Sequence, residues 1–134
     1  MLLFSCAFVG CGERERRSEE EIARDHIVFY SGIEVPTNSK MVYRYFREGF
    51  RELEEYTVFQ FESEPTDWLN KTSFSRGPNE QLERFFPPLY TLEEISQDYL
   101  PNFEEEYFGF MTDDYNYFIY VPQRLLLIVY VYIS

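Results

Sequence analysis

The chain has 134 residues, the length of a single domain that buries roughly two thirds of the surface its unfolded form exposes. It is 45% hydrophobic and 20% aromatic, which excludes the aromatic-poor composition of disordered chains. Its 24 acidic and 12 basic residues give a formal net charge of -12, which disfavours nucleic-acid phosphates and anionic membrane surfaces as direct partners. A basic protein partner, or simple solubility, accounts for such a charge.

The first seventeen residues change character abruptly at a cysteine. An uncharged apolar run over residues 1–10 ends before Cys11 and Gly12, and every residue from Glu13 to Arg17 is charged. The run has the length of the hydrophobic part of a secretory signal and is shorter than the ~20 residues of a membrane-spanning helix. Its end, AFVGCG, resembles the lipobox of bacterial lipoproteins, in which a cysteine is lipidated and becomes the new N-terminus.

This resemblance implies that residues 1–10 are a signal, that Cys11 carries the lipid, and that the protein is anchored in the bacterial cell envelope. Gly12 after the cysteine, in place of Asp, implies sorting to the outer membrane in a two-membrane cell. The alternative is that residues 1–10 form a buried first strand or helix of a cytoplasmic domain. The switch from apolar to charged residues at a cysteine favours a processing site.

Residues 11–26 mix charges of both signs and are interpreted as a solvated tether. A helical turn is expected near Ser18, a good N-cap residue with Glu21 three positions later. His26, the one histidine, lies at the edge of this tether. We therefore expect it to be exposed and to have no catalytic or metal-binding role.

The ordered domain is expected over residues 27–134. Residues 40–46 and 56–62 are rich in β-branched and aromatic side chains, and they predict an antiparallel pair joined by a charged loop at 47–55. Three short helices or turns are expected next, at residues 63–71, 77–86 and 91–100, the last with a capping box from Thr91 to Glu94. Trp68, in the first of them, is expected to close the core.

The C-terminal third predicts three strands in a meander, at residues 106–112, 115–121 and 124–133. In the last of these strands the odd positions, from Leu125 to Ile133, are all aliphatic and are predicted to face the core. The even positions end in Tyr130 and Tyr132, which are expected at a boundary with water. The fold class is therefore α+β: an antiparallel sheet of about five strands, with two or three short helices inserted in the middle.

The sequence supports binding more than catalysis. No nucleotide-binding or zinc-protease motif occurs, and Cys6 and Cys11 are the only cysteines, so the domain has no thiol for a metal site or nucleophile. We expect no enzyme activity, no cofactor, no metal and no nucleic-acid partner. The acidic residues Glu104, Glu105 and Glu106 precede a predicted strand, and Asp113 and Asp114 follow it, so the two groups are expected at opposite ends of that strand.

A binding surface is predicted where exposed aromatic residues lie beside this acidic rim. Its expected parts are the loop at residues 50–55 and the turn from Asp113 to Tyr115, with Glu104 to Glu106 contributing charge. Two classes of function remain. The first is a non-catalytic envelope lipoprotein that acts as a binding or structural accessory. The second is an acidic inhibitor or immunity-type protein whose charge meets a basic protein partner.

Overall fold

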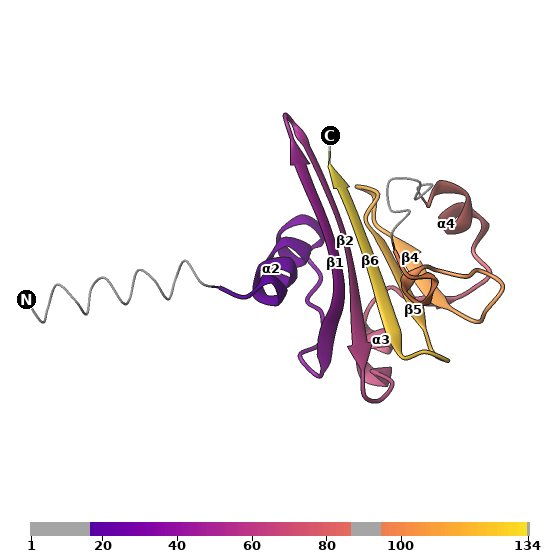
Figure 1. Cartoon of the computed structure of the whole chain (residues 1–134). Coiled ribbons are helices and arrows are strands. Elements are labelled where there is room, and N and C mark those ends of the chain that lie inside the picture. The colour runs from indigo at the N-terminus through magenta and orange to yellow at the C-terminus, as the bar shows by residue number, and fades with distance from the viewer. Residues whose placement is uncertain (1–16, 87–94, 134) are drawn as a thin grey trace, which may run out of the picture.

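The computed structural model describes residues 17–86 and 95–133. Its centre is an antiparallel six-stranded sheet of order β1-β2-β6-β5-β4-β3 (Figure 1). The strands are β1 (Ser39–Gly49), β2 (Glu52–Phe61), β3 (Ser75–Arg76), β4 (Phe108–Met111), β5 (Tyr117–Val121) and β6 (Leu126–Ile133). The α+β class is confirmed, with six strands where about five were expected, and the predicted β1–β2 pair and C-terminal meander are present.

Helix α2 (Glu19–Ser31) precedes the sheet. The side chain of Ser18 accepts a hydrogen bond from the Glu21 N–H at 3.1 Å, as the predicted N-cap requires. Gly32 ends the helix in the left-handed region at φ 74°, and its N–H donates to the Val28 carbonyl at 2.8 Å. Ala23 is fully buried in this helix. The folded domain therefore begins near Glu19. The prediction of a tether over residues 11–26 is wrong for residues 19–26, which belong to α2.

The β1–β2 hairpin is longer than the sequence analysis predicts. Residues 47–55 were expected to be a loop, but only Phe50 and Arg51 form the turn, with Arg51 at φ 65°. The charged residues continue both strands because they pair across them: Arg47 lies opposite Glu54, with 3.6 Å between Nε and Oε1. The expected loop is therefore mostly paired strand.

Both faces of the sheet are covered, so two cores form. The first lies under α2 and α3 (Thr66–Lys71) and contains Ile27, Val35, Leu53, Phe59, Phe61, Leu69, Phe110, Phe118, Tyr120, Leu127, Val129 and Val131. The second lies under α4 (Glu80–Phe85) and residues 95–107, and contains Tyr56, Val58, Leu82, Ile95, Tyr107, Tyr117, Ile119, Val121, Leu126, Ile128 and Tyr130. Figure 1 shows α2 and α4 on opposite sides of the sheet.

The predicted faces of the last strand need one correction. The odd positions do face the first core, but Tyr130 is buried in the second core, not at a boundary with water. Strand β6 lies between β2 and β5, near the middle of the sheet, so both of its faces are covered. Tyr132, beyond the covered region, is exposed.

The predicted short helices are present in part. Helices α3 and α4 form where two of them were expected, and Asn79 caps α4 by accepting from the Leu82 N–H at 3.0 Å. Of the third, residues 97–99 form a single 3₁₀ turn, η2 (Gln97–Tyr99). The capping box from Thr91 to Glu94 lies outside the described residues, as do Cys6 and Cys11.

Candidate functional site

A cleft of about 790 Å³ opens where the end of α2 meets the β4–β5 turn and the end of β6. We call it the aromatic–acidic cleft, after the side chains that line it. It brings together three predicted site residues, Asp113, Asp114 and Tyr115. The other lining residues are Phe29, Tyr30, Asn116, Tyr117, Tyr132 and Ile133.

The turn that carries the predicted residues is held by its own hydrogen bonds. The Thr112 carbonyl accepts from the Tyr115 N–H at 2.9 Å, and the Thr112 N–H donates to the Asn116 carbonyl at 2.9 Å. Tyr115 has φ 63°, the left-handed conformation that closes the turn. Because the backbone bonds are satisfied inside the turn, Asp113, Asp114 and Tyr115 extend into solvent.

A buried asparagine fixes this turn against the helix. Asn116 is buried, and its side-chain N–H donates to the Tyr30 carbonyl at 3.1 Å. That bond joins residues 86 positions apart in the chain. It places the acidic turn beside the last turn of α2, so residues of both elements line the cleft.

Aromatic side chains and carboxylates meet in this cleft, and no lysine or arginine is among its described lining residues. Phe29 is 80% exposed and Tyr115 57% exposed, and the Phe29 ring packs edge-on against Tyr30 with 4.9 Å between centroids. Within the described residues neither Asp113 nor Asp114 makes an ion pair or hydrogen bond. Aromatic faces and carboxylates both attract cations, so the cleft is suited to a lysine or arginine side chain.

The predicted acidic run lies elsewhere and is paired. Glu105 contacts Arg124 and Glu106 contacts Arg76, each with 3.3 Å between the charged atoms. Glu104, Glu105 and Glu106 precede β4 whereas Asp113 follows it, so they are at the opposite end of that strand, as expected. They do not line the aromatic–acidic cleft.

The expected loop at residues 50–55 is also largely unavailable for binding. Phe50 is exposed at the hairpin tip, but Leu53, Glu54 and Glu55 are buried. Glu54 accepts a hydrogen bond from Tyr130 on one face of β2, and Glu55 contacts α2 on the other. Only the tip of this segment can take part in recognition.

His26 is not in a tether. It lies within α2, and its Nδ1 is 3.0 Å from Oε1 of Glu55, which is only 1% exposed. Arg44 holds the other oxygen of the same carboxylate, with Nη2 at 2.6 Å and Nε at 2.7 Å. The trio joins α2 to β1 and β2 through one buried carboxylate, which Arg44 pairs and His26 contacts, so its role is structural.

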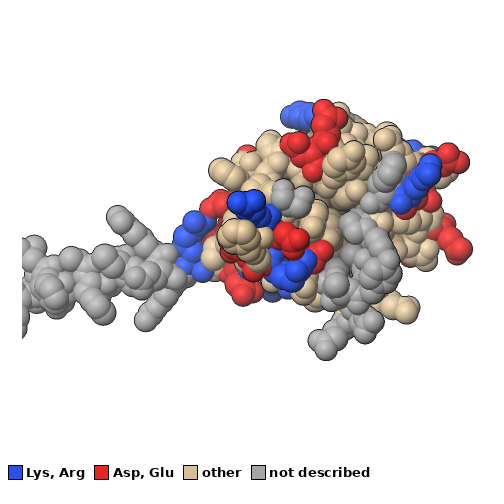
Figure 2. All heavy atoms as spheres, turned by 90° about the horizontal axis from the view of Figure 1, so that it is seen from above, with Lys and Arg blue, Asp and Glu red and all other residues tan. Residues whose placement is uncertain are grey.

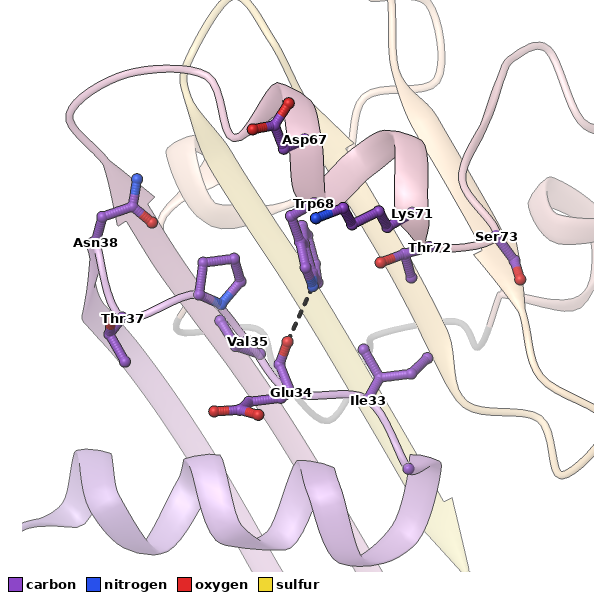
Figure 3. A pocket seen from close by; sticks show the side chains of 12 residues that line it. Ile33, Glu34, Val35, Thr37, Asn38, Asp67, Trp68, Lys71, Thr72 and Ser73 are labelled. Atoms are coloured by element: carbon purple, nitrogen blue, oxygen red, sulfur yellow. Dashed lines mark hydrogen bonds between the residues drawn. The ribbon is translucent and has the colours of Figure 1, made fainter.

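A second hollow, the Trp68 cleft, lies between α3 and the loop at residues 32–38, with a volume of about 800 Å³ (Figure 3). The Trp68 indole N–H donates to the Glu34 carbonyl at 2.9 Å, and its ring packs on Phe74 with 5.0 Å between centroids. Trp68 packs against the first core while remaining half-buried, so it both supports the core and forms a wall of the hollow. Figure 3 shows Lys71 extending toward the indole.

Sequence reasoning missed Phe29, Tyr30 and Tyr132. A signal for Phe29 was present, because the buried positions of α2, Ala23 and Ile27, are four residues apart and Phe29 is off that face. Its place beside Tyr115 and Tyr132 in one cleft, which makes an exposed aromatic patch, is visible only in the structure.

Comparisons with protein-family models, curated proteins and solved structures found no match to this chain. Across residues 17–86 and 95–133, no three His, Cys, Asp or Glu side chains gather closely enough to hold a metal ion. In the same ranges, no helix has the length and apolar character needed to cross a membrane.

Proposed function

We propose that this chain is a non-catalytic binding domain of the bacterial cell envelope, anchored by lipid on Cys11, whose aromatic–acidic cleft binds a basic segment of a protein partner. The observation that carries the binding proposal is the pairing of exposed Phe29 and Tyr115 with the carboxylates of Asp113 and Asp114, which have no cation among the described residues.

The distribution of charge supports a specific site over a general acidic surface. Figure 2 shows acidic and basic side chains next to each other in several places on one face, with uncharged surface between them. Arg47 contacts Glu52 and Glu54, for example, and Arg124 contacts Glu105. Carboxylates without such a partner keep their attraction for an incoming cation. Asp113 and Asp114 differ from Glu48, which is also unpaired among the described residues, because they line a cleft together with exposed aromatic side chains.

The net charge of -12 also favours a basic partner, through electrostatic attraction at long range. It accelerates the encounter with a basic partner, and the cleft then selects the docked orientation. The two contributions separate experimentally, because salt screens the first strongly and affects contacts within the cleft less.

The binding proposal is tested with an arginine-rich peptide as a probe, by fluorescence anisotropy at low and moderate salt. Asp113→Asn with Asp114→Asn should weaken binding by about tenfold, and Phe29→Ala with Tyr115→Ala should do the same. The matched control, Glu62→Gln with Glu104→Gln, removes the same charge at exposed positions outside the cleft. If the control weakens binding as much as the cleft variants, net charge alone is responsible and the cleft proposal is wrong.

The anchor proposal rests on AFVGCG, and it is tested by fractionation of the native host. Cys11→Ala should release the protein from the membrane fraction with its fold intact, whereas Cys6→Ala should leave it bound. Mass spectrometry of the mature protein should show a lipid on Cys11 and no residues 1–10. Equal fractionation of both variants and the wild type, or retention of residues 1–10, would contradict lipidation at Cys11.

A further inference from the structure

The two edges of the sheet differ greatly in length. One edge is β3, which has only 2 residues, and the other is β1, which has 11 (Figure 1). A long edge strand presents unpaired backbone groups that favour the addition of another strand. The outer side of β1 is therefore a candidate interaction surface, distinct from the aromatic–acidic cleft.

The hydrogen bonds within the sheet show which residues of β1 face outward. The Phe61 N–H donates to the Leu125 carbonyl, on the β6 side of β2. Because alternate residues of an antiparallel strand bond to opposite neighbours, Thr57, Glu55 and Leu53 also bond toward β6. Their partners on β1 are Arg44, Phe46 and Glu48, respectively, and these residues turn their N–H and C=O groups to the outer edge.

Only the start of this edge is covered within the described residues. The Met41 N–H donates to Oε1 of Glu20 at 2.8 Å, and a bulge lies between Met41 and Tyr43. Both features blunt an edge strand. Further along the strand, no described residue bonds to the outward backbone groups of Arg44, Phe46 and Glu48.

The free part of β1 is complementary to itself. If two copies pair antiparallel about Phe46, Phe46 faces Phe46 of the second copy, and Arg44 faces Glu48 of the second copy. On the other face of the strands, Tyr45 faces Arg47 of the second copy. These three kinds of pair, aromatic with aromatic, cation with anion and cation with aromatic, each stabilise adjacent strands, and the outermost pair in this register, Tyr43 with Gly49, adds no side-chain contact of these kinds.

We propose that two copies of this chain form a dimer by antiparallel pairing of β1 with β1, with the two-fold axis at Phe46. The outward N–H and C=O groups of Arg44, Phe46 and Glu48 then bond to those of the second copy, and the two sheets become one. A two-fold interface requires a self-complementary surface, and this register provides one.

The side chains are already positioned for this pairing. Glu55 holds Arg44 by an ion pair, and the Arg44 guanidinium lies over the Phe46 ring with 4.7 Å to its centroid. Glu48 is exposed and has no ion-pair partner among the described residues. The dimer would give Glu48 a cation and would cover the exposed part of Phe46.

The first test measures the oligomeric state by sedimentation velocity from low to high micromolar concentration. The full chain carries Cys6→Ser and Cys11→Ser, so that neither lipid nor a disulfide links copies. We expect a dimer, and Phe46→Lys or Phe46→Glu should each raise its dissociation constant by about tenfold or more, since like charges meet at the axis. An equimolar mixture of these two variants should dimerise again, whereas Phe50→Lys, at the hairpin tip, should have no effect.

A monomer at every concentration would overturn the proposal, and so would a dimer that Phe46→Lys does not weaken. The second test fixes the register by oxidative cross-linking in the same background. Phe46→Cys should form an intermolecular disulfide, because directly opposite Cα atoms are about 5.5 Å apart. Glu48→Cys should not, because the two copies of residue 48 are about 13 Å apart along the strands. Efficient cross-linking at 48 and not at 46 would show another register or another occupant of the edge.

Discussion

Glu55 is the residue whose environment differs most from a sequence-based expectation. Its carboxylate is buried between α2 and the sheet and is held by Arg44 and His26. Removing one partner of a buried pair leaves an uncompensated charge, so Arg44→Met should lower the free energy of unfolding by about 3–5 kcal/mol. In urea unfolding, the double variant Arg44→Met with Glu55→Leu should lose less free energy of unfolding than Arg44→Met alone. If the double variant loses more free energy of unfolding than Arg44→Met, the attraction within the pair exceeds the cost of desolvating it.

His26 gives a milder prediction at the same site. It bonds one oxygen of Glu55 while Arg44 keeps the other, so His26→Ala should cost only about 1 kcal/mol. Because His26 lies outside the aromatic–acidic cleft, peptide binding should be unchanged. Loss of binding in a folded, membrane-attached His26→Ala variant would show that this histidine has a functional role.

The sequence predicts local residue roles well and distant ones poorly. Ser18 was identified as an N-cap because its partner is three positions away. The His26–Glu55 contact joins residues 29 positions apart, and charged side chains are usually solvated, so neither its existence nor the burial of Glu55 follows from the pattern. The same limit hid Tyr30 from the predicted site, because it joins the acidic turn through Asn116, 86 positions away.

At the scale of elements, β6 is a central strand whose two faces are both buried, and this burial can be tested by substitution. Val129 is 0% exposed, whereas Tyr132 is 37% exposed. Val129→Asp places an unpaired charge in the first core and should unfold a domain whose total stability is ~5–15 kcal/mol. Tyr132→Asp should shift the thermal unfolding midpoint only slightly. Equal tolerance of the two changes would contradict the central position of this strand.

Strand pairing followed from the apolar, β-branched and aromatic content of the strands and from the turn residues between them, but strand length did not. The meander from β4 to β6 was predicted because its strands are apolar and separated by turn residues. The hairpin of β1 and β2 extends through residues 47–55 although that segment is charged. Cross-strand pairs such as Arg47 with Glu54 stabilise it, and such pairs are visible only once the register is known.

At the scale of the whole molecule, the aromatic content predicts the response to alkaline pH. Burial raises the pKa of Tyr120 to about 12, and burial together with the hydrogen bond to Glu83 raises the pKa of Tyr107 to about 12, from an ordinary value of 10.0. Above pH 10 the unfolded chain loses these protons first, so the folded state holds more protons than the unfolded state. Stability is therefore complete below pH 10 and falls as the pH rises toward 12.

Two phenylalanine variants separate this effect from general alkaline damage, with unfolding followed by urea titration at neutral and at high pH. The Tyr120 hydroxyl has no hydrogen-bond partner among the described residues, so Tyr120→Phe should leave stability at neutral pH unchanged or slightly higher. Tyr107→Phe should lower it by about 1–2 kcal/mol, because the hydroxyl donates to Glu83 and accepts from the Asn79 N–H at 2.8 Å. Both variants should lose less stability between pH 10 and 12 than the wild type. The control variant Tyr115→Phe, in the exposed turn, should lose as much stability as the wild type. If Tyr115→Phe protects the fold as well as the buried variants do, burial of Tyr107 and Tyr120 is not the source of the alkaline instability.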